Sequence, residues 1–131
     1  MADPEEINEW LDKANEDCRV VEVLLKAREE LTLPSMFHIQ QMLEKYLKAL
    51  ILAQGSAFER THDLARLTNL ANAADIENLL EFSETLNLFA VNGRYPGDLP
   101  DIEPSEAHRY FRTAKEVRDQ LLERIDAVRG I

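Results

Sequence analysis

Apolar residues recur at spacings of three and four along most of this chain, which is the pattern of helices that bury one face. The first such stretch follows Asp3, a suitable N-cap, and Pro4, which the first helical turn tolerates. It predicts a helix that runs to about Leu31. The predicted buried stripe of this helix consists of Ile7, Trp10, Leu11, Ala14, Cys18, Val21 and Leu25.

Pro34 interrupts this pattern, because the residue before a proline disfavours the helical conformation. A second helix is predicted from Pro34 or Ser35 to just before Gly55, a residue suited to the left-handed position after a helix. Apolar residues cover more than half of its circumference, so we expect it at the centre of the fold. Its polar strip consists of Gln40, Gln41, Glu44, Lys45 and Lys48. The strip is consistent with a pocket lining, with a subunit interface, or with plain helix stabilisation by the Glu44–Lys48 pair.

Three further helical patterns follow. Thr61 is predicted to open a short helix, Asp75 to cap the next one, and the last helix to begin near Pro104 or Ser105. The segment 92–104 is rich in proline and glycine and is predicted to be a loop, with Pro96 and Gly97 in a type II turn. No alternating run typical of a strand is present. The sequence therefore predicts one all-α domain over residues 1–131, an antiparallel up-and-down bundle of four main helices plus one short helix.

Four consecutive residues concentrate potential chemistry, namely Arg60, Thr61, His62 and Asp63. In one interpretation, Thr61 caps a helix, Asp63 complements the helix dipole, and the other two side chains face water. In the other, His62 acts as an acid or base while Arg60 holds an anion. Spacing alone favours the helix start, but it leaves Arg60 and His62 unexplained.

Other polar residues carry weaker signals. Glu59 and His62 form one Glu-x-x-His element, but a carboxylate-bridged di-metal bundle needs two, so no metal site and no cofactor is expected. His38 is expected to be a hydrogen-bonded core or interface residue. Arg94 beside Tyr95, in the predicted loop, suits contact with a phosphate or a base, or else a turn with Tyr95 packed on the core.

Charge and composition narrow the function classes. The formal net charge is −10, which disfavours sequence-independent binding of nucleic acid. Cys18 is the single cysteine, so no intrachain disulfide can form, in keeping with a reducing cytosol. Because the first residues lack a signal-peptide pattern and no apolar run approaches bilayer length, a cytoplasmic protein without a membrane span is expected.

Three stretches in combination resemble the HEPN (higher eukaryote and prokaryote nucleotide-binding) domain family. They are "FHIQQMLEKYLKALILAQG" with "RTHDLARL", then "RYPGD", then the final helix that begins "EPSEAHRYFRTAKEV". The resemblance covers the chain from about Trp10 to Val128. It implies a helical bundle, a homodimer with a polar cleft at its interface, and pairing with a minimal nucleotidyltransferase in a toxin–antitoxin-like module.

The chain departs from the ribonuclease branch of this family, whose members place an Arg four to six intervening residues before a catalytic His. None of His38, His62 and His108 has an Arg in that window. We therefore expect a non-catalytic module that binds a nucleotide or a nucleotidyltransferase partner. The predicted ligand-binding residues are Lys45, Lys48, Arg60, His62, Asp63, Arg94 and Tyr95.

Two alternatives stay open at this point. The first is a metal-independent ribonuclease in which His62 works with Arg60 or Arg94 through space, which would make His62 the candidate catalytic residue. The second is a helical scaffold without a binding site. Whether the polar residues of different helices converge decides between these alternatives.

Overall fold

The computed structural model describes residues 3–27, 31–90, 97 and 99–131. These residues form helices and connecting segments, with no strand among them, which confirms the predicted all-α class. The helix predicted as the fourth main one is only nine residues long, so three long helices and two short ones make up the described bundle. The helices are α1 (Pro4–Lys26), α2 (Thr32–Ala53), α3 (Leu64–Leu70), α4 (Leu79–Asn87) and α5 (Pro104–Arg129).

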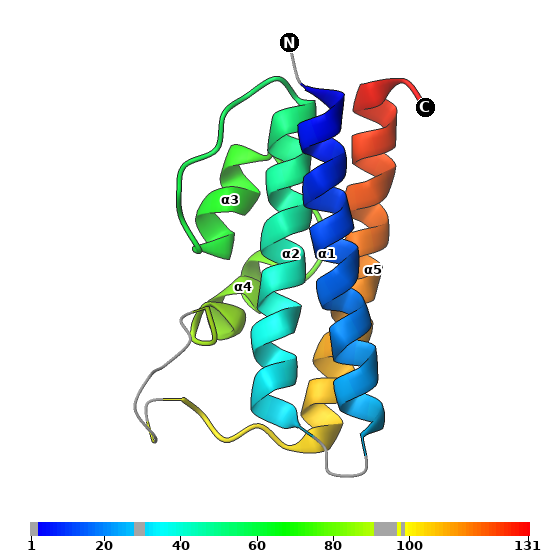
Figure 1. Ribbon diagram of the computed structural model, residues 1–131. Coiled ribbons are helices and arrows are strands. Elements are labelled where there is room, and N and C mark those ends of the chain that lie inside the picture. Colours follow the sequence, from blue (N-terminus) through cyan, green and yellow to red (C-terminus); the bar gives the residue numbers. More distant parts are fainter. Residues whose placement is uncertain (1–2, 28–30, 91–96, 98) are drawn as a thin grey trace.

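The three long helices lie side by side, and α1 runs opposite to both α2 and α5 (Figure 1). The short helices α3 and α4 lie on the other side of α2 and bring the chain back, so that α5 runs in the same direction as α2 (Figure 1). Helix α2 packs against each of the other four helices. The prediction that the second helix lies at the centre is therefore confirmed.

Helix α1 begins as predicted, because the Asp3 carboxylate accepts a hydrogen bond from the Glu5 backbone N–H at 2.9 Å. Its predicted stripe is buried or packed against the core. The predicted end at Leu31 is wrong. The helix ends at Lys26, because the backbone of Ala27 is extended, with a ψ of 151°.

Helix α2 begins at Thr32, two residues earlier than the first predicted position. A proline in the first turn is compatible with this start, because the first backbone N–H groups of a helix have no partner within the helix. At the other end, Gly55 adopts a φ of +83° directly after the cap residue Gln54, as predicted.

The predicted starts of the two short helices are both wrong. Helix α3 is capped by Asp63, whose carboxylate accepts from the backbone N–H groups of Ala65 and Arg66. Thr61 instead accepts a hydrogen bond from the Asp63 N–H, ahead of the helix. Asp75 does not cap α4, which begins directly after Asn78. Instead, the Asp75 carboxylate pairs with Arg124 of α5 at 2.6 Å.

The last helix begins at the predicted proline. Pro104 occupies its first turn, and the side chains of Glu103 and Glu106 form a reciprocal capping box. Pro96 of the predicted turn lies outside the described residues. Within the described ranges, every helix is too short or too polar to cross a bilayer.

Two valines on α1 test how the stability depends on this core. Val21 is fully buried, whereas Val23 is 65% exposed. We expect Val21→Ala to lower the free energy of unfolding by about 2 kcal/mol, through lost apolar burial and the cavity left behind. Val23→Ala, the matched control, should change it by less than about 0.5 kcal/mol. Urea denaturation measures both, and equal losses would contradict the packing described for α1.

Candidate functional site

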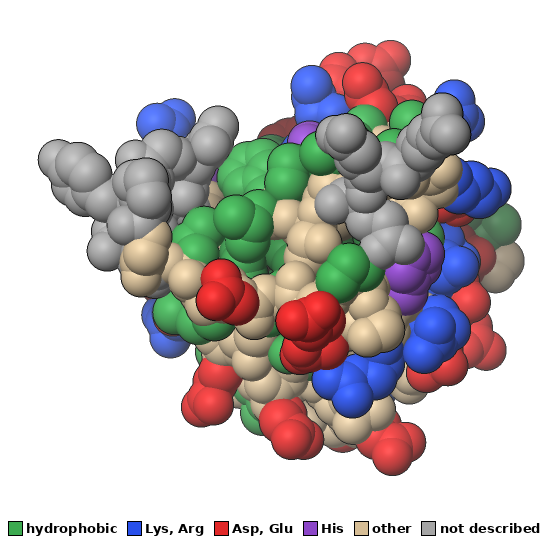
Figure 2. Space-filling view, turned by 90° about the horizontal axis from the view of Figure 1, so that it is seen from below, with side chains coloured by type: hydrophobic (Ala, Val, Ile, Leu, Met, Phe, Trp, Pro, Cys, Tyr) green, Lys and Arg blue, Asp and Glu red, His purple; other side chains and the backbone are tan. Residues whose placement is uncertain are grey.

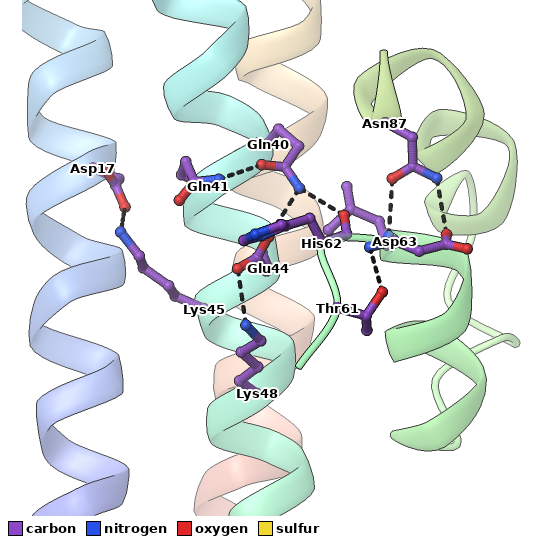
Figure 3. Close-up of polar contacts among 11 residues, drawn as sticks. Asp17, Gln40, Gln41, Glu44, Lys45, Lys48, Thr61, His62, Asp63 and Asn87 are labelled. Atoms are coloured by element: carbon purple, nitrogen blue, oxygen red, sulfur yellow. Dashed lines mark hydrogen bonds and ion pairs between the residues drawn. The ribbon is translucent and has the colours of Figure 1, made fainter. Parts of the chain in front are cut away.

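The segment Thr61–Asp63 joins three helices. Asn87, the last residue of α4, accepts from the Leu64 N–H and donates to Asp63 Oδ1, each at 2.9 Å (Figure 3). On the other side, the Gln40 amide of α2 donates to the His62 carbonyl at 3.0 Å. The segment is therefore fixed to α2 and α4 at the point where α3 begins.

The side chain of Glu44 lies at the centre of these contacts. Gln40, Glu44 and Lys48 are four residues apart on α2, which aligns them on one helix face (Figure 3). The Glu44 carboxylate is only 3% exposed and has three partners. One oxygen lies 2.8 Å from His62 Nδ1 and 3.2 Å from Gln40 Nε2, and the other accepts from Lys48 Nζ at 3.0 Å. A buried carboxylate needs such partners to remain charged.

Lys48 is enclosed from two further sides. Its ammonium lies 5.2 Å from the ring centroids of both Trp10 and Phe58, and these two rings meet edge to face at 5.3 Å. Only 7% of the Lys48 side chain is exposed. A cation held between two aromatic rings and a carboxylate is stabilised where it lies, so its contacts join α1, α2 and the segment before α3.

The His62 ring is exposed while its anchor is buried. The side chain is 63% exposed, and Nδ1 faces the Glu44 carboxylate. A carboxylate accepts hydrogen bonds, so Nδ1 carries the proton and the lone pair of the neutral ring lies on Nε2. No hydrogen bond to Nε2 occurs within the described residues. The ring can therefore accept a hydrogen bond or a proton from a bound molecule.

Arg60 is exposed and forms no ion pair with any described residue. It precedes His62 by two positions, on a segment held in place by Gln40, Glu44 and Asn87. The structure therefore presents, on the same fixed connection, one imidazole and one guanidinium that pairs with no described carboxylate.

A second polar cluster lies between α1 and α2. The Asp17 carboxylate is 2.9 Å from His38 Nδ1 and accepts from Lys45 Nζ at 2.5 Å (Figure 3 shows the lysine contact). Asp17 is 7% exposed, so its charge is neutralised inside the helix pair. The expectation that His38 is hydrogen-bonded is confirmed. Lys45 points at Asp17 rather than at the Glu44 cluster.

The remaining candidates are distributed as follows. Arg94 and Tyr95 lie outside the described residues, so their convergence with Arg60 and His62 stays a prediction. Cys18 is buried as predicted, and burial raises the pKa of its thiol despite the nearby Arg118. The Glu59 carboxylate pairs with Arg66 at 2.7 Å. Among the described residues, no group of three or more His, Cys, Asp or Glu side chains could hold a metal ion.

Sequence reasoning identified the polar strip on α2 but did not assign Gln40 and Glu44 to the site. The available signal was the four-residue spacing of Gln40, Glu44 and Lys48 on a helix that is otherwise largely apolar. Buried polar groups need partners, and on such a helix that requirement points to a partner from another segment. The partner, His62, could be recognised only once the connection before α3 was in place.

The fold and the buried polar network define an all-α bundle built on a central helix. The HEPN domain model matches residues 7–125, so the chain belongs to the HEPN domain family. The crystal structure of TT1696 from Thermus thermophilus superposes with a TM-score of 0.72 at 24% identity, covering 90% of this chain and 97% of that one. At this identity the likeness shows the fold alone. No curated protein matches the sequence significantly.

Substitutions at the central carboxylate test the network. Glu44→Ala removes the counter-charge of buried Lys48 and should lower the free energy of unfolding by about 3–5 kcal/mol. The double variant Glu44→Gln/Lys48→Met removes both charges and should recover much of this loss. Glu16→Ala, the same substitution at an exposed position of α1, serves as the control and should change it by less than about 0.5 kcal/mol. Chemical denaturation measures all three, and a neutral Glu44→Ala would contradict the network.

Proposed function

We propose that this protein is a non-catalytic HEPN module that binds a nucleotide through the surface formed by Arg60 and His62. Membership of the HEPN domain family supports a role connected with nucleotides or RNA. The observation that carries the proposal is the exposed His62 ring on a buried Glu44 anchor, with Arg60 two positions away. By the family resemblance, the module dimerises and pairs with a nucleotidyltransferase in a toxin–antitoxin-like system.

The chemistry of the two side chains suits a phosphorylated ligand. Arg60 can donate two parallel hydrogen bonds to phosphate oxygens, and no described carboxylate competes for it. His62 offers Nε2 to a base edge, a sugar hydroxyl or, when protonated, a phosphate. Because Gln40 and Glu44 fix the backbone and the ring of His62, little conformational entropy is lost on binding.

The predicted ligand residues divide into two roles under this proposal. Arg60 and His62 contact the ligand. Lys48 and Asp63 hold the segment that carries Arg60 and His62 in position. Lys48 does so through its ion pair with Glu44, and Asp63 as the cap of α3. Lys45 acts at a distance, by neutralising Asp17 between α1 and α2. Arg94 and Tyr95 stay predicted contacts.

ATP binding to the purified full chain tests the proposal. Arg60→Ala should weaken the affinity about tenfold or more, through the loss of charge-assisted hydrogen bonds. Arg66→Ala removes the same charge six positions along, where the guanidinium already pairs with Glu59, and should stay within about twofold of the parent. Isothermal titration calorimetry gives the constants. The proposal fails if neither ATP nor a nucleotidyltransferase encoded beside this gene binds.

The Glu44–His62 contact specifically favours a second candidate, a metal-independent ribonuclease. A carboxylate that holds Nδ1–H leaves Nε2 as a potential base for a ribose 2′-hydroxyl. The candidate predicts cleavage of single-stranded RNA in the presence of a chelator, slowed about a hundredfold or more in His62→Ala relative to the parent. His108→Ala is the control and should keep the activity. RNA that stays intact with the parent protein rules the enzyme out.

A further inference from the structure

A groove of about 390 Å³ lies between α1 and α5 and shares no residue with the Glu44 network. Helix α1 contributes Glu22 and Lys26 to its lining, and the first half of α5 contributes three basic side chains. Seen from the lower end of the bundle, Lys, Arg and His side chains lie among Asp and Glu side chains on the right, where α1 and α5 lie in Figure 1 (Figure 2). The basic side chains of α5 that line the groove are His108, Arg112 and Lys115.

Few described carboxylates lie near the cations of this groove. Within the described residues, neither Lys26, nor Arg112, nor Lys115 forms an ion pair with a carboxylate. Among the described lining residues, Glu22 is the single acidic one. The groove is therefore locally positive, although the chain as a whole has a net charge of −10. A concave surface concentrates the electrostatic field of the charges that line it.

The floor of the groove is apolar. Leu25 and Phe111 are both buried at its base, and Lys115 Nζ lies 4.6 Å from the centroid of the Phe111 ring. The contact with the ring holds the ammonium over the groove without neutralising its charge. A few cationic groups above an apolar floor are typical of a site for a small molecule with an anionic group.

We propose that this groove is a second binding site, for a small molecule that carries a phosphate group. Arg112 and Lys115 lie three residues apart and so project from neighbouring positions of one helix face, while Lys26 approaches from the other wall. The Arg112 guanidinium supplies the planar, bidentate contact, and the two ammonium groups supply point charges.

The balance of charge favours a small ligand over a polyanion. At physiological ionic strength the field of a surface charge extends about 8 Å. A molecule contained in the groove meets mainly the local cations, whereas a nucleic acid or a long acidic peptide would also meet the acidic surface around it. The proposal does not depend on the Arg60–His62 surface.

Titration of the full chain with inorganic pyrophosphate tests this site. Arg112→Gln should weaken binding about fivefold or more, and Arg112→Gln/Lys115→Gln should abolish it. Arg109→Gln makes the same charge change on the same helix, outside the groove lining, and should stay within about twofold of the parent. Each variant is made in an Arg60→Ala background, because the Arg60 surface is itself proposed to contact phosphate oxygens, so the pyrophosphate binding that remains reports on the groove. Calorimetry measures affinity, and circular dichroism checks that each variant is folded.

Several results would overturn the inference. They are absence of pyrophosphate binding in the Arg60→Ala background, and equal weakening by Arg109→Gln and Arg112→Gln. A polyglutamate peptide or a single-stranded RNA that binds in an Arg112-dependent way, while pyrophosphate does not bind, would assign the groove to a polyanion and also overturn it. Binding of pyrophosphate that is weakened in Arg112→Gln, lost in Arg112→Gln/Lys115→Gln and kept in Arg109→Gln supports it.

Discussion

The buried carboxylate of Glu44 is the constraint on which the candidate site depends. Its two oxygens face Lys48, Gln40 and His62, which come from α2 and from the connection before α3. Transfer of a carboxylate from water into a protein interior is costly, and the cost is offset only while these partners stay in place. The position of the connection is therefore tied to the stability of the central helix.

That arrangement explains how a short segment becomes a fixed surface. Two side chains of α2 hold the backbone and the ring of His62, while Asn87 of α4 holds Asp63 and the start of α3. The connection before α3 exposes Arg60 and the outer edge of the His62 ring to solvent. A recognition surface that is positioned by buried polar contacts loses little entropy on binding.

The cationic side chains of the molecule lie in two kinds of environment. The net charge is −10, yet two cations of α2 lie against buried carboxylates, Lys45 against Asp17 and Lys48 against Glu44. Other cations, in the groove between α1 and α5, form no ion pair with a described carboxylate. The Asp17–Lys45 pair connects α1 with α2, whereas the groove cations, which no described carboxylate neutralises, are proposed to meet a ligand. Net charge alone describes neither group, because the field at a surface depends on where each charge lies.

The sequence by itself determined the helical class, the central position of the second helix and the buried faces, because apolar periodicity directly reports which side of a helix faces the core. It also located the start of α5, where Pro104 and Glu106 give a local capping signal. The predicted helix caps at Thr61 and Asp75 were wrong, because several neighbouring polar residues could serve as the cap. The partners that fix the choice, Asn87 for Asp63 and Arg124 for Asp75, lie far along the chain. Only the tertiary structure decided that Lys45 faces Asp17 and that His62 meets Glu44. Pairing between buried charges depends on the distance between helices, and spacing along one helix does not contain that distance.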